Sequence, residues 1–475
     1  MKRVPRTDET AEAARLAFEE ASAWLAGLEE RPVLPEGAET AVRSFGGPLP
    51  EEGGGAVAAL EELAAGFDAA TASPGPRFFH FVTGGVTPAA LGADWLATAL
   101  DQNAFSRVGS PLATRLETVA VDWLKELFEL PAEWGGALTT GATSANFMGL
   151  GAARQWWGEQ HGRDIGADGM AGLPPVPVLS SGFIHPSALK ALAQLGIGRA
   201  TVQTFSRDAV GRIDLPALER ALRDLGGAPA ILVGNAGEVN AAEFDPIGAL
   251  AGLAEEHGAW LHVDGAFGLF ARLSPRSAHL AEGVERAHSV IADGHKWLNV
   301  PYDCGFAFVR DPALLAKVFS LQAAYLPGEE PEPTYGYLSP ETSQRARAVA
   351  VWAALRAWGR SGYREMVERH LDLAQRLAGL VDDAPDLERL ADVPLNIVCF
   401  RYRPEGVPEE ELDALNARLG EEVLADGRVY FGTTSFGGRV AFRPAIVNWR
   451  TGESDIDLLV GVVQELGAGL LARTK

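Results

Sequence analysis

AWLHVDGAF at residues 259–267 and HSVIADGHKW at residues 288–297 carry the strongest fold signal in the chain. Each begins as a short apolar run and ends in polar or charged residues beside a glycine, which is typical of a buried strand followed by a turn. Five similar runs surround these two and are separated by helical patterns: GALTT, PVPVLS, TVQTF, PAILVGN and CGFAFVR. The alternation predicts an α/β fold, in which a mostly parallel seven-stranded sheet lies between helices.

Capping residues and prolines mark where the intervening helices start. The predicted helices begin at Ser110–Pro111, run from Ser144 to Trp157 and from Pro186 to Leu195, and begin again at Asp214 and at Asp245–Pro246. Ligands of such sheets bind beyond the carboxyl ends of the strands. We therefore expect the functional residues at those ends.

The length of 475 residues predicts two or three domains. Residues 1–75 form helices between Pro- and Gly-rich breaks and hold too few apolar residues for a core of their own, so we expect them to pack on another surface. Residues 76–340 are expected to form the large domain, whose segment 327–340 is predicted to be a mobile loop. Residues 341–475 are expected to form a smaller α+β domain with a long helix, two or three strands and a final helix.

Composition excludes several classes of protein. A net charge of −22 argues against nucleic acid or an anionic membrane as the main partner. The two cysteines, Cys304 and Cys399, fall in strand-like runs and are expected to be buried free thiols, which fits a reducing compartment. The N-terminus lacks the apolar core of a signal peptide, and no run of about 18 apolar residues occurs. We expect a cytoplasmic protein that spans no membrane.

Lys296 and Asp264 each follow an apolar strand. A lysine desolvated among Trp297, Leu298 and Val300 would have a lowered pKa and could attack a carbonyl carbon, although a surface charge is the simpler explanation for an isolated His-Lys pair. Asp264 could cap a turn, or it could keep the nitrogen of a pyridine cofactor protonated.

Two further segments fit the same chemistry. In LTTGATSANFMGL (138–150), the amides at a helix start and the hydroxyls of Thr143 and Ser144 could bind a phosphate, or could simply cap the helix. His185 could be a core histidine or could stack on an aromatic ring. Because all four features follow successive strand ends, we interpret them together as a site for pyridoxal phosphate (PLP).

The chain resembles the PLP-dependent group II amino-acid decarboxylases, which include aromatic-L-amino-acid and glutamate decarboxylases. The resemblance rests on RFFHFVTGGVTPAALGADWL (77–96), SPLATRLETVAVDWL (110–124), GATSAN, HVDGAF (262–267) and HKW (295–297). It implies the fold-type I architecture of PLP-dependent transferases. It also implies a homodimer in which the N-terminal segment packs on the partner and the active sites are shared.

The resemblance also implies roles for particular residues. Lys296 would hold PLP as a Schiff base, and Tyr325, on a mobile loop, would protonate the carbon that CO2 leaves. The other expected contacts with PLP are Asp264 to the ring nitrogen, Ala266 and His185 on the two faces of the ring, His295 at the phosphate or the Schiff base, and Ala142 and Thr143 at the phosphate. His185 would also lie close to the substrate carboxylate.

Substrate contacts are expected from Phe81, Thr83 and Arg107. The chain has Phe105-Ser106-Arg107 where aromatic-specific members carry a tryptophan in the third position, and an arginine there would favour an acidic or polar substrate. Arg443 could bind a carboxylate or pair with an acidic neighbour. Two other positions depart from the family pattern: Glu238 or Asn240 would replace a threonine, and Asp293 stands where asparagine is common.

The predicted reaction is decarboxylation of an L-amino acid to an amine. In the family, phenylalanine in place of Tyr325 accompanies oxidative decarboxylation–deamination to an aldehyde, so tyrosine favours the simple reaction. The alternatives are another PLP reaction, such as that oxidation or transamination, and a catalytically silent PLP-fold binding protein. No metal is expected.

Overall fold

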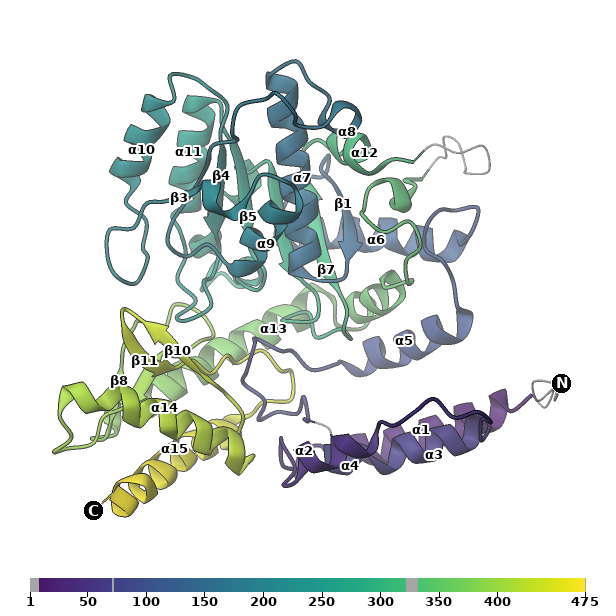
Figure 1. The fold of residues 1–475 in the computed structure, drawn as a ribbon, viewed down its shortest axis with the longest axis vertical. Helices are drawn as coiled ribbons and strands as arrows, with labels where there is room; N and C mark the ends of the chain where they lie inside the picture. The colour runs from purple at the N-terminus through teal and green to yellow at the C-terminus, as the bar shows by residue number, and fades with distance from the viewer. Residues whose placement is uncertain (1–7, 71, 322–331, 475) are drawn as a thin grey trace.

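The computed structural model describes residues 8–70, 72–321 and 332–474. Its centre is a seven-stranded sheet in the order β1-β7-β6-β5-β4-β2-β3 (Figure 1). The strands are β1 (Gly135–Thr139), β2 (Val178–Ser180), β3 (Val202–Thr204), β4 (Ile231–Asn235), β5 (Trp260–Asp264), β6 (Ser289–Asp293) and β7 (Gly305–Val309). All seven predicted strands are present, so the α/β prediction is confirmed.

Only β7 runs against its neighbours. It pairs antiparallel with both β1 and β6, whereas β3, β2, β4, β5 and β6 pair in parallel. An antiparallel neighbour needs a turn rather than a crossover, so residues 294–304 stay at the carboxyl end of β6. In this register Gly305 lies opposite both Thr139 and Asp293, which brings the ends of β1 and β6 together.

Helices cover both faces of this sheet. Along β6, Val290 and Ala292 enter one hydrophobic cluster and Ile291 enters the other, as alternation in a doubly covered sheet requires. The helices of this region are α5 (Pro88–Leu100), α6 (Pro111–Phe128), α7 (Ala142–Gln160), α8 (Ile165–Asp168), α9 (Pro186–Gln194), α10 (Leu215–Asp224), α11 (Ile247–His257) and α12 (Ala313–Phe319).

The predicted helix starts need two corrections. Ser110 occupies the N-cap of α6, but its side chain makes no capping hydrogen bond. α7 begins at Ala142 rather than Ser144, because Gly141 adopts a φ of 147° and lets the chain turn directly from β1 into the helix. Thr143 and Ser144 therefore lie within the first turn of α7.

The C-terminal part contains a second, antiparallel sheet in the order β10-β11-β9-β8. Its strands are β8 (Leu387–Arg389), β9 (Phe400–Tyr402), β10 (Thr433–Phe436) and β11 (Arg439–Phe442), and its helices are α13 (Ala348–Asp383), α14 (Glu409–Asp426) and α15 (Glu453–Thr474). The prediction of two or three strands was wrong. β8 and β10 are only three and four residues long and largely half-buried or exposed, so they lack the apolar run of a buried strand.

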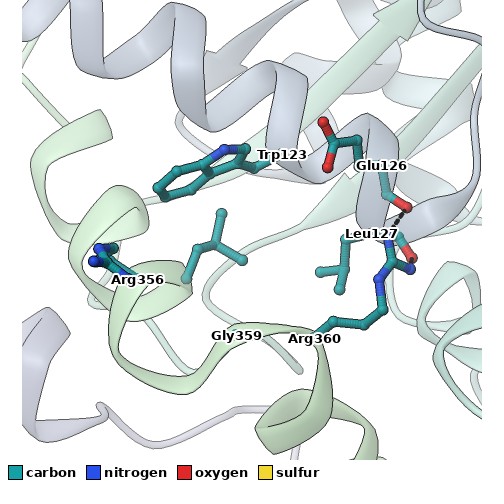
Figure 2. Close-up of a pocket in the computed structure, with 7 residues that line it drawn as sticks. Trp123, Glu126, Leu127, Arg356, Gly359 and Arg360 are labelled. Atoms are coloured by element: carbon teal, nitrogen blue, oxygen red, sulfur yellow. Dashed lines mark hydrogen bonds between the residues drawn. The ribbon is translucent and has the colours of Figure 1, made fainter.

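α13 is bent at Gly359, whose φ of 60° and ψ of −176° are not helical. The part before the bend packs on α5 and α6, and the part after it reaches α15 and β8 (Figure 1). Figure 2 shows the Arg360 guanidinium beyond the bend, where it donates to the carbonyls of Glu126 and Leu127 at the end of α6. A cavity of about 270 Å³ lies there, beside Trp123.

The N-terminal helices lie beside one another along α5 (Figure 1). They are α1 (Thr10–Ala26), α2 (Ala38–Ala41), α3 (Ala56–Ala65) and α4 (Phe67–Ala70). Neither α1 nor α3 buries a residue. Apolar side chains of α1, α3 and α5 line a groove of about 590 Å³, in which Phe18 contacts Trp95 edge-on while remaining 57% exposed.

The predictions for the two cysteines and for the segment 327–340 can also be compared with the structure. Both cysteines are buried and free, as expected. The segment 327–340 is not a mobile loop throughout, because Tyr335 is buried and its hydroxyl donates to Thr118, while residues up to 331 lie outside the described part. Among the described residues, none of the helices combines the length and the apolar character needed to cross a membrane.

Candidate active site

Lys296 lies in the turn between β6 and β7, where its side chain is 16% exposed. Its Nζ is 3.2 Å from Asp293 Oδ2 and 5.9 Å from the centre of the Phe267 ring. The segment before α5 packs directly on this turn, since the Gly84 amide donates to the carbonyl of His295. A Cβ on Gly84 would lie 2.0 Å from the Lys296 carbonyl oxygen, so only glycine permits this approach.

A small cavity of about 20 Å³ lies beside Lys296. Four of the predicted site residues line it: Lys296, Asp264, Ala266 and His185. Its other walls are formed by Phe183, Asn235, Gly237, Glu238, Val239 and Phe267. The cavity therefore brings an amine, a carboxylate and an imidazole from three different strand ends to one place.

Asp264 ends β5 opposite Asn235 of β4. Its carboxylate is buried and accepts two hydrogen bonds: Oδ1 from the Ala266 amide at 3.1 Å, and Oδ2 from the Asn146 side chain at 2.9 Å. Together these two hydrogen bonds hold both carboxylate oxygens in place. Asp264 therefore presents a fixed acceptor to the cavity.

His185 caps α9 and reaches the same cavity. Its Nδ1 accepts the Ser187 amide at 3.2 Å and lies 2.7 Å from the Ser187 hydroxyl. Burial lowers the pKa of His185, which the Asp264 carboxylate offsets in part and the Lys296 charge lowers further. The imidazole is thus mainly neutral at pH 7.

The start of α7 lies next to the lysine turn. The Ala142 amide donates to Asp293 Oδ1 at 2.7 Å, and His295 Nε2 lies 3.4 Å from Asp293 Oδ2. A Cβ on Gly141 would be 2.9 Å from His295, so glycine is required for the close approach. Burial acts to raise the pKa of Asp293, but the Lys296 charge and the contact with His295 outweigh it, and the carboxylate stays ionised.

Sequence reasoning overlooked Asn146. It lies one turn into α7 and is fully buried, and its amide bonds to Asp264. The signal was available, because it is a polar side chain between Ala145 and Met148 on the face of α7 that covers the sheet. A polar residue in such a position needs partners, and here the partner is a site carboxylate.

The residues expected to contact substrate lie less close together. Phe81 has a φ of 56° and is 62% exposed, and the buried Thr83 hydroxyl lies 3.3 Å from the Tyr302 hydroxyl. Arg107 is exposed in the turn before α6 and does not line the cavity formed by the described residues. Tyr325 lies outside the described residues.

Glu238 lines the cavity, whereas Arg443 does not line it and contacts Val239 of its wall. The Arg443 guanidinium donates to the Val239 carbonyl at 3.1 Å, and burial lowers its pKa while the Glu238 charge opposes that effect. Glu238 itself accepts the amides of Asn240 and Ala241. Asn240 bonds through its side chain to the Thr434 hydroxyl at 2.7 Å, away from Lys296.

Comparison with known proteins identifies the family. The model of the pyridoxal-dependent decarboxylase conserved domain matches residues 67–403. The chain belongs to this family. Membership makes it a PLP-dependent carboxy-lyase by class, as the sequence analysis expected.

Relatives of this decarboxylase differ in the reaction that their names record. Aromatic-L-amino-acid decarboxylase of Bacillus atrophaeus is 29% identical over 384 residues, which cover 79% of this chain and 78% of the relative. Tyrosine decarboxylase 1 of Narcissus pseudonarcissus is 30% identical over 420 residues, or 84% and 80% of the two chains. Phenylacetaldehyde synthase of Arabidopsis thaliana is 28% identical over 411 residues, or 83% and 82%.

Solved structures agree on the fold of the decarboxylase. Oryza sativa TDC with PLP and tryptamine superposes with a TM-score of 0.89 at 24% identity, covering 99% of this chain and 100% of that chain. Mouse CSAD superposes with a TM-score of 0.88 at 23% identity, covering 97% and 99%. The expected PLP-dependent fold-type I architecture is confirmed.

The residues present fit PLP. An amine, a buried carboxylate and an imidazole line one cavity. Gly141 lets His295 and Asp293 pack against the start of α7 next to Lys296. Asp293 already accepts the Ala142 amide, so a phosphate held there would add negative charge beside it. The His295 ring lies at the same place, with its Nε2 3.4 Å from Asp293 Oδ2.

Proposed function

We propose that this family member removes the α-carboxylate of an L-amino acid as CO2 and releases the corresponding amine. The observation that carries the proposal is the single cavity shared by Lys296, Asp264 and His185. The family assignment supports decarboxylation. The proposal adds that the substrate is an L-amino acid and that its Cα is protonated to give the amine.

Bound PLP would supply an electron-withdrawing ring that stabilises the negative charge left on Cα when CO2 departs. The amine of Lys296 would bind the cofactor covalently and be displaced by the substrate amine. Asp264 would keep a proton on the ring nitrogen, because the hydrogen bonds from Ala266 and Asn146 fix the position of its carboxylate. The neutral His185 would lie against the ring and exclude water from that face.

Arg443 is the cationic group that we propose for the substrate carboxylate. It donates to the Val239 carbonyl, and Val239 lines the cavity. A bidentate guanidinium would fix which bond at Cα is broken, since orientation selects the reaction. R443K should raise KM about 10-fold or more, whereas the exposed R418K should leave it unchanged; equal KM values would contradict this role.

The central test is a decarboxylation screen of the purified protein. CO2 and amine would be measured over the twenty amino acids, ornithine, diaminobutyrate and dihydroxyphenylalanine, with acidic and polar substrates testing the expected role of Arg107. K296A should abolish CO2 release, whereas K190A, at an exposed lysine of α9, should not. A colourless wild-type protein that takes up no PLP would support the silent binding protein instead.

The second candidate outcome is oxidation to an aldehyde, and relatives named phenylacetaldehyde synthase favour testing it. We propose that Tyr325 protonates Cα and so directs the reaction to the amine. The same assays would therefore measure aldehyde and peroxide. The expected result is amine from the wild type and a rise in aldehyde for Y325F; aldehyde and peroxide without amine from the wild type would contradict the proposal.

We further propose a cytoplasmic homodimer in which each chain has domain boundaries near residues 75 and 340. Helices α1 and α3 bury no residue, and the groove that they form with α5 exposes apolar side chains that a partner chain would cover. Light scattering should give twice the mass of one chain. A monomer that kept full activity would disprove the shared active site.

A further inference from the structure

A chain of buried polar side chains lies behind Asp264, on the side away from the cavity. Trp260 Nε1 donates to Ser289 Oγ at 3.0 Å, and Ser289 Oγ is 2.7 Å from His262 Nδ1. His262 Nε2 is 2.8 Å from Asn146 Oδ1, and Asn146 Nδ2 is 2.9 Å from Asp264 Oδ2. Four hydrogen bonds thus connect β5, β6 and α7 to the carboxylate.

The direction of these hydrogen bonds is fixed by chemistry. An ionised carboxylate only accepts, so Asn146 must present its NH2 group to Asp264 and its carbonyl oxygen to His262. The Nε2 atom of His262 must therefore carry the proton, and its Nδ1 must accept from Ser289. Burial lowers the pKa of His262 to about 4, so the neutral imidazole that this arrangement needs is the form present at neutral pH.

The same amide reaches the other side of the cavity. A second N–H of Asn146 points to Ser187 Oγ at 3.2 Å, and that hydroxyl lies 2.7 Å from His185 Nδ1. Because Ser187 Oγ accepts from Asn146, its own hydrogen is available to His185. His185 Nδ1 then acts as an acceptor, and the proton of the neutral imidazole lies on Nε2.

Packing holds this chain of polar side chains in place. His262 lies against α7 at Gly149, where a Cβ would be 2.7 Å from the imidazole. No larger residue fits there without moving the ring. Asn146, His262 and Ser289 are all fully buried, so water does not compete for their hydrogen bonds.

We propose that Asn146 is a positioning residue of the active site, which orients the Asp264 carboxylate and, through the Ser187 hydroxyl, helps to hold the His185 ring. The inference rests on the proposed function, because it assigns Asn146 a role in how the site holds PLP. Asn146 would not contact the cofactor or the reacting atoms. It would keep the Asp264 carboxylate aimed at the ring nitrogen.

The test compares N146L with N416L. Leucine has nearly the shape of asparagine, and each substitution removes three hydrogen bonds from a fully buried site. Asn416 makes its three within the C-terminal part, to the backbone of Tyr402 and Leu412. A merely structural role for Asn146 would therefore make the two variants alike.

Three quantities would be measured on the protein loaded with PLP: the protonation of the ring nitrogen by solid-state 15N NMR of labelled cofactor, the Kd for PLP, and kcat. For N146L we expect loss of the proton signal at pH 7, and PLP affinity and kcat each lowered about 10- to 100-fold, which is the range found when the hydrogen-bond partner of a metal ligand is removed. N416L should match the wild type in all three. An unchanged ring-nitrogen signal and PLP affinity in N146L would overturn the inference.

A second pair covers the case that N146L does not fold. The amide of H262Q can donate to Asn146 as the imidazole does, whereas H262L cannot, so H262Q should keep the ring-nitrogen signal and H262L should lose it. Identical signals from both would overturn the inference. If the wild type binds no PLP and releases no CO2, the proposed function fails and this inference with it; an active wild type with equal variants removes this inference alone.

Discussion

The replacement of Glu117 by glutamine should change how the stability of the protein depends on pH. Glu117 projects from α6 into the core, and its carboxylate accepts the Leu138 amide at 3.0 Å. Burial raises its pKa from 4.5 to about 8, with only partial opposition from that hydrogen bond and from the charge of Arg347. The folded chain thus binds a proton that the unfolded chain releases between these pH values.

The magnitude follows from the shift. Because the folded state binds more protons between pH 4.5 and 8, the free energy of unfolding falls by about 1.4 kcal/mol for each pH unit that the pH rises in this range. The contribution is fully present below pH 4.5 and lost as the pH passes about 8. Glutamine keeps an acceptor for Leu138 and cannot ionise, so E117Q should gain about 3 to 4 kcal/mol over the wild type between pH 5 and pH 8.

Urea unfolding of the cofactor-free proteins at pH 5, 6, 7 and 8, followed by tryptophan fluorescence, measures this difference. E410Q, at an exposed glutamate of α14, is the matched control and should show no such trend. Taking the difference between variant and wild type cancels all other titrating groups. A difference between E117Q and the wild type that stays constant within about 0.5 kcal/mol from pH 5 to 8 would refute the reasoning.

Two further predictions concern packing and thiol reactivity. G84A should abolish PLP binding and lower Tm, because its Cβ would collide with the Lys296 carbonyl. G92A in α5 has no atom near its Cβ, so this variant should be neutral or stabilising by about 0.5 to 1 kcal/mol. Equal Tm values for the two variants would contradict the close approach at Gly84. Burial raises the pKa of the Cys399 thiol to about 12 and that of Cys304 higher still. A thiol reagent at pH 8 should therefore label neither cysteine in the native protein and both after unfolding. Fast labelling of the native protein would contradict the burial of these thiols.

Much of the sheet and part of the site could be predicted from the sequence, because strand ends in an α/β sheet meet at one edge. Lys296, Asp264 and His185 were expected together for this reason, and the structure places all three around one cavity. Their chemical roles remain predictions. Arg107 does not line the cavity that the described residues of its own chain form. The sequence could not predict this, because a turn residue carries no periodic signal that fixes the direction of its side chain.

The register of the strands and the direction of β7 were harder to predict from the sequence. The antiparallel course of β7 follows from the short connection at residues 294–304, which holds no helix, and this connection places Asp293 beside the start of α7. Departure from the usual asparagine marked Asp293 in the sequence, but only the register shows its contact with Ala142. The sequence marks Asn146 as a polar side chain on an apolar helix face, but its partners, Asp264 and His262, are more than a hundred residues away and only the structure identifies them.

The bend at Gly359 gives α13 a second task besides joining the two sheets. Directly after the left-handed glycine, the Arg360 guanidinium donates to the Glu126 and Leu127 carbonyls and so adds to the backbone hydrogen bonds that end α6. An alanine at position 359 would therefore strain its own backbone and also disturb the contact that this part of α13 makes with the end of α6.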